Sequence, residues 1–415
     1  MDTYIISFLI VGLLLLFVTL GSGWISGLPF SYALIYLIVG VLLGPYGIHV
    51  VNVRPQAEVI ERFAEFTVLI SLFSCGLKMS RPLQFRAWNS TIRLIGLLMP
   101  ICILALAIVG RVFLGLPWGA AILLSAILAP TDPVLASEIQ LSDAEDHDEL
   151  RFGLTSEGGL NDALAFPFVY FGIYLIEDPQ WQNWFRQWVL VDIFWAIAAG
   201  IVMGILVAQL VTLIHRKLRR LKSANALMED FIALSMVMIT YALTEMVNGY
   251  GFVAVFVAGM VVQRNQVTPE TYHSQLDFSE QIEKLMEVGI ILVLGSSLRV
   301  EPMIRFSGEI FLVAVLLIFV IRPVGTWVST VGSSLQPTRR WLYGWLGIRG
   351  LGSIYYLSYA FGKGLSGEVG EEVGWVVYFT VAISIVLHGI SATPLMTWYE
   401  QKMLRLKKRI FSTRE

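Results

Sequence analysis

Two carboxylates stand within an apolar segment of this chain, in the stretch "TSEGGLNDALAFP" at residues 155–167. Glu157 and Asp162 lie in a run, residues 150–176, that otherwise has the length and composition of a membrane-spanning helix. An ionisable group at the centre of such a helix costs roughly 2.5–3.5 kcal/mol on insertion scales, and groups kept there usually mark a path for ions or protons. The two carboxylates are therefore candidates for binding a cation or a proton.

The spacing of the polar residues on this helix separates them onto two faces. Glu157 and Asn161 are four residues apart and share a face. Asp162 is five residues from Glu157, which corresponds to about 140° around an α-helix. One carboxylate can then pair with a base from another helix while the other faces a cavity. Gly158 and Gly159 precede Asp162, where small residues allow either close helix packing or exposure of backbone near a bound ion.

A second apolar segment contains an aspartate between two prolines, in "LAPTDPVLAS". Pro130 and Pro133 each remove a backbone donor and obstruct the preceding turn, so the helix is expected to break around Thr131 and Asp132. Broken backbone at mid-membrane is tolerated only against protein or a water-filled cavity. Freed carbonyls and a carboxylate are hard oxygen ligands that suit a small cation. The alternative is a simple proline kink, which would not need the aspartate.

Two arginines also fall inside apolar segments. Arg322 precedes a proline, and Arg349 lies in "LGIRGLGS" with three glycines around it. Together with Asp132, Glu157 and Asp162, they give three acidic and two basic residues near the middle of the predicted membrane spans. Pairing can account for some of these charges, as in a structural ion-pair network, but it leaves at least one carboxylate unbalanced. We therefore favour a transport path over a purely structural network.

The composition of the whole chain indicates the elements that position these residues. Of 415 residues, 56% are hydrophobic and only 14% are charged, whereas soluble proteins carry about a quarter charged residues. Apolar windows recur from end to end, which predicts an all-α polytopic membrane protein. The approximate spans number about 13 and cover residues 4–22, 30–47, 60–78, 90–112, 118–138, 150–176, 189–214, 229–247, 249–263, 283–298, 306–331, 339–361 and 373–399.

Several functional classes are disfavoured by the same composition. The net charge of −2 gives no reason to expect a nucleic-acid partner. Cys75 and Cys102 lie in apolar segments and imply neither a disulfide framework nor a metal site. Ser156 stands beside Glu157, but no histidine in the segment could serve as a base, so an intramembrane hydrolase is disfavoured. We expect no enzyme activity and no cofactor.

The distribution of Lys and Arg sets the expected orientation. The strongest basic clusters all follow odd-numbered spans, and the connections after even-numbered spans are poorer in Lys and Arg. By the positive-inside rule this predicts an external amino terminus and a cytoplasmic carboxyl terminus in the inner (plasma) membrane. The first apolar run lacks a basic leader and a cleavage motif, so we expect it to be a retained helix. The basic clusters are Lys78/Arg81/Arg86, "HRKLRRLK", Arg339/Arg340 and "KMLRLKKR".

The interrupted spans occupy corresponding places in two halves of the chain. Spans 5 and 12 are the penultimate members of two six-helix sets, residues 1–176 and 229–399, with span 7 (189–214) as a linker. Interrupted helices at corresponding positions point to a transporter binding site between repeats. We therefore expect one transmembrane domain built of two inverted repeats, followed by a short basic tail at 400–415.

The remaining polar residues have simpler explanations. His388 is assigned to packing or to a hydrogen bond at a helix end. The other groups are expected in solvated loops or near span ends, namely His215, His273, Glu287, Asp192 and Asp230.

The motifs "TDP", "EGGLNDA", the "RP" at 322–323 and "GIRGLGSIYYL" resemble those of the NhaP-type sodium/proton antiporters of the first cation:proton antiporter family. The resemblance extends from span 2 to span 13, and the ordered set of four motifs is specific. It implies a core domain with two crossed, discontinuous helices, here spans 5 and 12, that moves against a dimerisation domain. A homodimer is expected on the same grounds.

The resemblance also implies roles for individual residues. Asn161 and Asp162 match the family's asparagine–aspartate pair, with Asp162 as the carrier of cation and proton. Thr131 and Asp132 match its threonine–aspartate–proline motif, whose oxygens help to form the cation site. These implied ligands are the expected site of the monovalent cation.

Three further matches concern charge, and two departures concern the ligands. Glu157 and Arg322 match the family's salt bridge, and Arg349 matches the arginine of its second broken helix. The family usually has a serine where Gly158 stands. It often has an acidic residue where "LFSCGLKM" has Ser74, which is a possible accessory ligand. Fewer side-chain oxygens at the site would affect ion selectivity.

These residues predict exchange of a monovalent cation for protons by alternating access. Desolvation disfavours the charged form of Asp162, so either a proton or a cation can neutralise it. Asn161 stands where a second carboxylate would be, and the resemblance then implies electroneutral exchange. Na⁺ or Li⁺ is the expected cation. The alternatives are a K⁺/H⁺ antiporter of the same fold and a cation channel, which would not need a titrating carrier.

Overall fold

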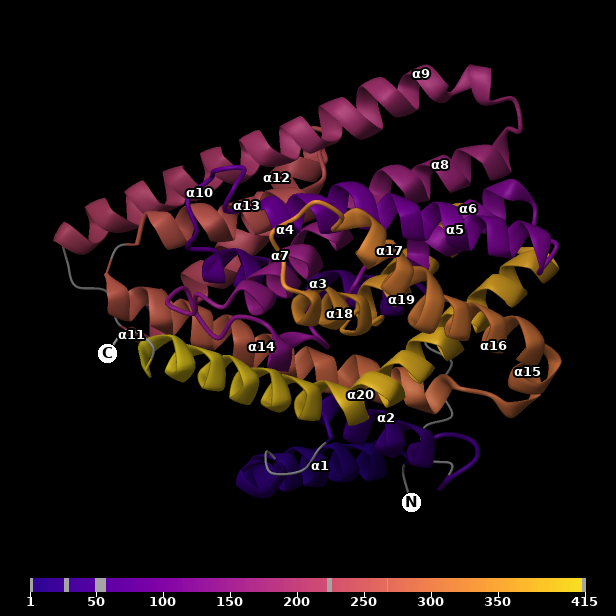
Figure 1. Ribbon diagram of the computed structural model, residues 1–415, viewed down its shortest axis with the longest axis horizontal. Helices are drawn as coiled ribbons and strands as arrows, with labels where there is room; N and C mark the ends of the chain where they lie inside the picture. The colour runs from indigo at the N-terminus through magenta and orange to yellow at the C-terminus, as the bar shows by residue number, and fades with distance from the viewer. Residues whose placement is uncertain (1–2, 26–29, 49–56, 222–225, 267, 413–415) are drawn as a thin grey trace.

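The computed structural model describes residues 3–25, 30–48, 57–221, 226–266 and 268–412, and within these ranges the chain is a bundle of helices without a β-strand (Figure 1). The helices up to residue 177 are α1 (Thr3–Ile25), α2 (Tyr32–Leu43), α3 (Ala57–Lys78), α4 (Asn89–Arg93), α5 (Met99–Val112), α6 (Trp118–Leu128), α7 (Glu149–Leu164) and α8 (Phe166–Glu177).

The second part of the chain contributes the remaining helices. They are α9 (Phe185–Gln187), α10 (Ala196–Leu221), α11 (Ala226–Glu229), α12 (Phe231–Met246), α13 (Gly251–Arg264), α14 (Pro269–Ser297), α15 (Val300–Arg305), α16 (Ser307–Val315), α17 (Arg322–Ser329), α18 (Pro337–Trp345), α19 (Leu351–Gly362) and α20 (Gly367–Ser412). Stretches of π-helix join three pairs of helices in series, and these stretches are Leu94–Leu98, Trp188–Trp195 and Leu316–Ile321.

Apart from the two interrupted spans, 5 and 12, each predicted span coincides with a helix or with helices joined in series, so the all-helical prediction is confirmed. The division between the eighth and ninth spans rested on four residues only, "NGYG". The structure places a turn there, between the end of α12 and the start of α13, and Asn248 adopts a left-handed conformation with φ of 54°. Asparagine tolerates this conformation better than most residues, which explains how so short a segment reverses the chain.

The helices α14 and α20 extend furthest beyond their predicted spans. The helix α14 begins at Pro269, although its apolar part was predicted to start only at residue 283. Thr268 caps it by accepting a hydrogen bond from the N–H of Thr271, and Pro269 occupies the first turn. The helix α20 has 46 residues and includes most of the segment that was predicted as a separate tail, 400–415. Hydropathy detects only the apolar part of a helix, so the polar extensions were not predicted.

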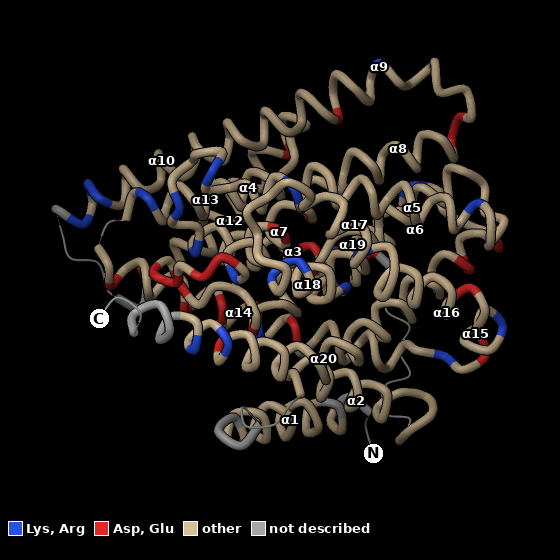
Figure 2. The backbone as a smooth tube through the Cα atoms, in the orientation of Figure 1, with Lys and Arg blue, Asp and Glu red and all other residues tan. Residues whose placement is uncertain are grey.

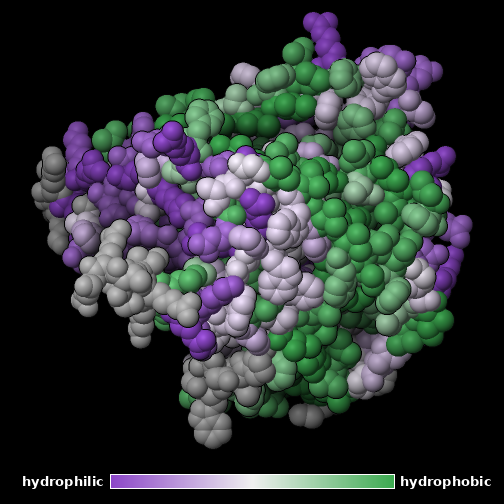
Figure 3. Space-filling model, in the orientation of Figure 1, coloured by the Kyte–Doolittle hydropathy of each residue, from purple (hydrophilic) through white to green (hydrophobic). Residues whose placement is uncertain are grey.

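Length and composition support a membrane location. Among the described residues, five helices or helix series are long and apolar enough to cross a membrane, and five shorter apolar helices of 10–17 residues accompany them. In Figure 3, hydrophobic side chains cover the middle of the visible face, and hydrophilic ones gather mainly at its left end. The long series are Asn89–Val112, Glu149–Glu177, Phe185–Arg219, Ser307–Ser329 and Gly367–Leu406.

Lys, Arg, Asp and Glu residues lie mainly toward the two ends of the bundle, with fewer of them between the ends (Figure 2). At one end Arg81, after span 3, lies 2.6 Å from Glu149, which precedes span 6. At the other end Arg305, before span 11, lies 2.8 Å from Glu368, which precedes span 13. Connections after odd-numbered spans thus meet each other, as do connections after even-numbered spans, which agrees with the alternating topology.

The two predicted breaks lie against each other inside the bundle. The helix α6 ends at Leu128, and the chain is irregular until the short 3₁₀ turn Ser137–Ile139. The second break separates α18 from α19 over residues 346–350. The N–H of Asp132 donates to the carbonyl of Ile348 over 2.9 Å, so the interrupted helices touch at their irregular segments. The place where these two segments meet is the crossing. The prolines around Asp132 and the glycines around Arg349 explain why regular helix stops at these points.

Candidate functional site

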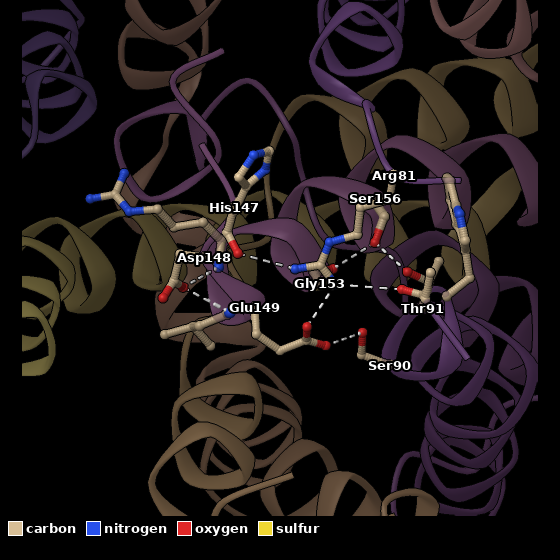
Figure 4. A network of polar contacts seen from close by, with 12 residues as sticks. Arg81, Ser90, Thr91, His147, Asp148, Glu149, Gly153 and Ser156 are labelled. Atoms are coloured by element: carbon tan, nitrogen blue, oxygen red, sulfur yellow. Dashed lines mark hydrogen bonds and ion pairs between the residues drawn. The ribbon is translucent and has the colours of Figure 1, made fainter. Parts of the chain in front are cut away.

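Polar contacts hold the beginning of α7, the helix that carries Glu157 and Asp162 (Figure 4). Asp148 caps the helix, since its Oδ1 accepts from the N–H groups of Leu150 and Arg151 over 2.8 and 3.0 Å. The carboxylate of Glu149 accepts from Arg81 over 2.6 Å. These contacts tie the first turn of α7 to the connection that follows α3.

A second contact holds α7 at Ser156, the residue directly before Glu157. The hydroxyls of Ser156 and Thr91 lie 2.5 Å apart, and Ser156 Oγ also donates to the carbonyl of Gly153 over 3.2 Å (Figure 4). Both hydroxyls are buried. The helix is therefore fixed in rotation against α4, and this rotation decides where its two carboxylates point.

Glu157 points toward α17 and meets Arg322. The guanidinium donates from Nη1 to Oε1 over 2.8 Å and from Nη2 to Oε2 over 3.0 Å, and both side chains are buried. Bidentate geometry of this kind is the strongest arrangement of the two groups. A Cβ at Gly347 would overlap the Arg322 guanidinium, so the glycine leaves the space that the arginine occupies. The carboxylate of Glu157 is thereby neutralised by a partner from another helix.

Asp162 lies on a different face of α7 and has no such partner. Its side chain is 1% exposed, and Oδ2 makes no hydrogen bond within the described part of the chain. The carboxylate lies over Gly352 of α19, where a Cβ would stand 2.5 Å from Oδ1. The backbone carbonyl of Asp162 accepts a hydrogen bond from the hydroxyl of Tyr356. The site thus contains one buried carboxylate oxygen that is free to accept a proton or a cation.

Asn161 links α7 to the first break. Its Nδ2 donates to Thr131 Oγ1 over 2.8 Å, while its Oδ1 is buried and has no hydrogen-bond partner among the described residues. Because Thr131 Oγ1 accepts this bond, one lone pair of the hydroxyl remains available. Unpartnered oxygens on Asn161 and Asp162 therefore lie on consecutive residues at the crossing.

Asp132 is bonded differently from Asp162, although it is equally buried. Its Oδ1 accepts from the N–H groups of Val134 and Leu135 over 2.8 and 3.1 Å. Its Oδ2 accepts from the N–H groups of Leu351 and Gly352 at the start of α19, the latter over 3.2 Å. The carboxylate thus caps the second broken helix at its positive N-terminal end. This cap is a role that the spacing of the sequence did not reveal.

Arg349 is the largest of the most deeply buried side chains, at 1% exposed. Its backbone N–H donates to Ser384 Oγ over 2.8 Å. None of its three guanidinium nitrogens has a hydrogen-bond partner in the described residues. A buried cation without such bonds adds positive charge near the crossing and balances the excess of acids there.

The remaining predicted ligands make other contacts. Ser74 Oγ donates to the carbonyl of Ile70, one turn back on α3, over 3.1 Å. A Cβ at Gly158 would lie 3.3 Å from Gln140 Nε2, a buried donor without a partner among the described groups. The structure therefore brings together Thr131, Asn161 and Asp162 at the crossing, and it engages the Ser74 hydroxyl with its own helix.

Two expectations about other polar residues need correction or extension. His215 was expected in a solvated loop, but it lies within α10, is 8% exposed, and has Nε2 3.8 Å from Glu229. The basic cluster around it made the segment look like a loop, whereas the helix continues through it. His388 bonds the end of α18 as expected, with Nε2 2.8 Å from the carbonyl of Trp345. Glu287 was placed near a span end but is buried within α14.

The family model of the transmembrane sodium/hydrogen exchanger matches residues 5–398. The chain is 25% identical over 409 residues to the K⁺/H⁺ antiporter NhaP of Alkalimonas amylolytica, a match that covers 96% of this chain and 67% of that protein. It is 22% identical over 317 residues to an Na⁺/H⁺ antiporter of Schizosaccharomyces pombe, covering 70% of this chain and 67% of that one. The chain thus spans about two thirds of the length of these relatives.

The fold has a counterpart among solved structures. The sodium proton antiporter MjNhaP1 from Methanocaldococcus jannaschii, determined at pH 8, superposes with a TM-score of 0.73 at 19% identity. The match covers 94% of this chain and 100% of that one. At this identity the likeness concerns the fold alone.

Proposed function

This chain belongs to the sodium/hydrogen exchanger family, whose members are transporters and not enzymes, and from that premise we propose that it exchanges a monovalent cation for protons across a membrane. The exchange proceeds by alternating access, in which one site faces each side in turn. The cation and the proton are the cargo, and no resident cofactor is proposed.

The observation that carries this proposal is the environment of Asp162. A carboxylate that is 1% exposed, with an oxygen that no described group satisfies, is neutral only when it holds a proton or a cation. The two ligands then compete for one group. Competition at one site couples the two fluxes without a separate energy source. The hydroxyl of Thr131 and the amide oxygen of Asn161 supply further oxygens for the cation.

The charge balance supports electroneutral exchange. Glu157 is neutralised by Arg322, and Asp132 is bonded by four backbone N–H groups. Asp162 is then the one carboxylate at the crossing without a partner in the described residues. One carrier carboxylate takes either one monovalent cation or one proton, so each cycle moves no net charge.

Na⁺ or Li⁺ is the proposed cation, with K⁺ as the alternative. The departures at Gly158 and Ser74 remove side-chain oxygens that would favour a small dehydrated ion. A relative that is 25% identical carries the name of a K⁺/H⁺ antiporter, which gives the alternative its own support. We further propose a homodimer in the inner (plasma) membrane, serving pH homeostasis, with the amino terminus outside and the carboxyl terminus in the cytoplasm.

Flux measurements on reconstituted protein test the proposal. Proteoliposomes with an imposed pH gradient should take up Na⁺, Li⁺ or K⁺ at a rate that saturates with cation concentration and reverses with the gradient. A cation channel of the same fold would conduct without a pH gradient, and its flux would follow the membrane potential. Flux of that second kind, or no pH-driven flux of any of the three ions, would overturn the proposed antiport.

A further inference from the structure

A cavity of about 440 Å³ opens beside the first broken helix, and the exchange mechanism above makes no use of it. One wall is α14, which contributes Glu280, Glu283 and Glu287. The opposite wall is the connection after α6, with Leu135 and Glu138. Residues of α1 and α2 and the end of α3 complete the lining. The N–H of Leu135 bonds Asp132, so this wall separates the cavity from the crossing.

The lining carries more negative than positive charge. Its charged residues are Glu138, Glu280, Glu283 and Glu287 against Lys78 and Lys284. Lys78 forms an ion pair with Glu280 over 2.7 Å, which leaves three carboxylates facing one ammonium group. With all groups ionised the cavity then has an excess of two negative charges.

Glu287 indicates that this acidic wall is more than a solvated surface. Its side chain is 6% exposed, lines the cavity, and makes no hydrogen bond or ion pair within the described ranges. Glu283, one turn earlier, accepts a single hydrogen bond from Ser71 over 2.9 Å and is similarly buried. Burying a carboxylate without a partner is unfavourable, so the position of Glu287 is best satisfied by a ligand in the cavity.

The lining favours a hydrated monovalent cation as the ligand. The excess charge excludes anions. Among the described residues no three acidic, histidine or cysteine side chains converge as the ligands of a divalent or transition metal would. The cavity holds on the order of ten waters at about 30 Å³ each, which is room for an ion with its hydration shell.

The cavity reaches the depth of the carrier residue. Cys75 of α3 packs against Gly159 of α7, because a Cβ at that glycine would stand 3.2 Å from the Cys75 Cβ. The two helices are antiparallel, since the residues after α3 contact the start of α7. Ser71 and Asp162 therefore lie in the same direction from this contact, by about 6 and 4.5 Å at 1.5 Å per residue. Glu283, bonded to Ser71, is thus nearly level with Asp162.

We propose that Glu283 and Glu287 form a loading site, which holds a hydrated monovalent cation in the cavity before the ion passes to Asp162. This inference rests on the proposed function and names a second binding station for the same cargo. Lys284 is part of the loading site, where its ammonium group competes with the cation for the two carboxylates. Its exposed side chain lines the same cavity, forms no ion pair among the described groups, and screens the carboxylates when no cation is present.

A loading site of this kind affects how readily the protein binds the cation from solution. It does not affect the later step in which Asp162 carries the ion. Negative charge in a narrow cavity raises the local cation concentration and the rate of association. Loss of that charge should raise the apparent KM for the cation, while the maximal rate stays within about twofold of the wild type.

The experiment is cation-dependent antiport by the full chain in proteoliposomes, with Na⁺ and K⁺ each as the probe at fixed pH. Glu283→Gln and Glu287→Gln should each raise the apparent KM roughly three- to tenfold, the size expected for removing one charge several ångströms from the ion in a water-filled cavity. Lys284→Gln should lower it by a similar factor. Asp277→Asn is the matched control, because Asp277 is exposed on the same helix and does not line the cavity.

The outcomes separate this inference from the proposed function. A wild type without pH-driven exchange refutes the function. A wild type that exchanges, with an unchanged apparent KM in both glutamate variants, refutes the loading site only. A reduced maximal rate at unchanged KM also refutes it, because the residues would then act in the carrier step. Should the glutamate variants not fold, the exposed Lys284 still decides the matter, since an unchanged KM in Lys284→Gln contradicts the inference.

Discussion

The region around Glu157 and the region around Asp162 use the same chemical group on the same helix in opposite ways. Arg322 donates to both oxygens of Glu157 over 2.8 and 3.0 Å and so neutralises the carboxylate. Five residues later, Asp162 lies over a glycine, and its Oδ2 has no partner in the described structure. The surroundings, and not the residue type, separate a structural acid from a candidate carrier.

The largest expected difference between the two regions is in transport. Asp162→Asn should abolish exchange, because the amide can neither release a proton nor balance a cation. Its melting temperature should equal or exceed that of the wild type, since a buried neutral amide is less unfavourable than a carboxylate with a free oxygen. Exchange by purified Asp162→Asn protein at near wild-type rate would assign the carrier role elsewhere.

Substitutions in the region around Glu157 should mainly lower the stability of the folded protein. Glu157→Gln and Arg322→Ala each leave one buried charge without its partner, which costs about 3–5 kcal/mol of unfolding free energy. Thermal unfolding in detergent measures the loss. A matched reference is Glu177→Gln, which removes an exposed carboxylate at the end of α8 and should change little.

A double substitution sharpens the same comparison. Glu157→Gln combined with Arg322→Ala removes both charges, so part of the lost stability should return. The coupling in the double-mutant cycle then measures the direct interaction. Strictly additive losses would mean that the observed hydrogen bonds contribute no direct pairing energy.

Asn161 provides a smaller test of the region around Asp162. Wild-type exchange should be indifferent to membrane potential, because one carrier carboxylate moves no net charge per cycle. Asn161→Asp adds a titratable group, so cation binding should show an altered pH dependence. The variant need not become electrogenic, since Arg322 and Arg349 are permanently charged and can neutralise the new carboxylate. A severalfold change of the wild-type rate under a clamped potential would remove the electroneutral assignment.

The smallest effect is expected for Ser74→Ala. The Ser74 hydroxyl already donates to the Ile70 carbonyl, an internal bond that contributes little to helix stability. Stability should change by about 1 kcal/mol or less, and the apparent KM for the cation should stay at the wild-type value. A severalfold increase of that KM would instead make Ser74 a ligand, as the resemblance first suggested.

Much of the fold could be predicted because its signals are local. Apolar runs indicated the helices, and Pro130 and Pro133 indicated the first break. The polar part of α14 and the extension of α20 could not be predicted in the same way, because a hydropathy window does not detect a helix that leaves the apolar layer. His215 was misassigned for the same reason.

The candidate site was less accessible to sequence reasoning, because its contacts join distant segments. Asp132 was expected as a cation ligand, and the structure adds that its Oδ2 accepts from two N–H groups at the start of α19, more than 200 residues away in the chain. Nothing near Asp132 in the sequence indicates that partner. Glu287 was placed at a span end because the first part of α14, residues 269–282, is not apolar enough to count as membrane helix.

The free oxygen of Asp162 has a consequence for the energetics of the whole chain. When neither a cation nor a proton is bound, this buried oxygen has no partner, and the folded protein is then at its least stable. A cation that binds to Asp162 therefore stabilises the folded state. By mass action, a cation at a hundredfold excess over its dissociation constant adds about 2.7 kcal/mol to the free energy of unfolding. We therefore expect the melting temperature of the purified protein to rank Na⁺, Li⁺ and K⁺ by affinity, which would identify the cation that the protein binds most tightly without any measurement of flux.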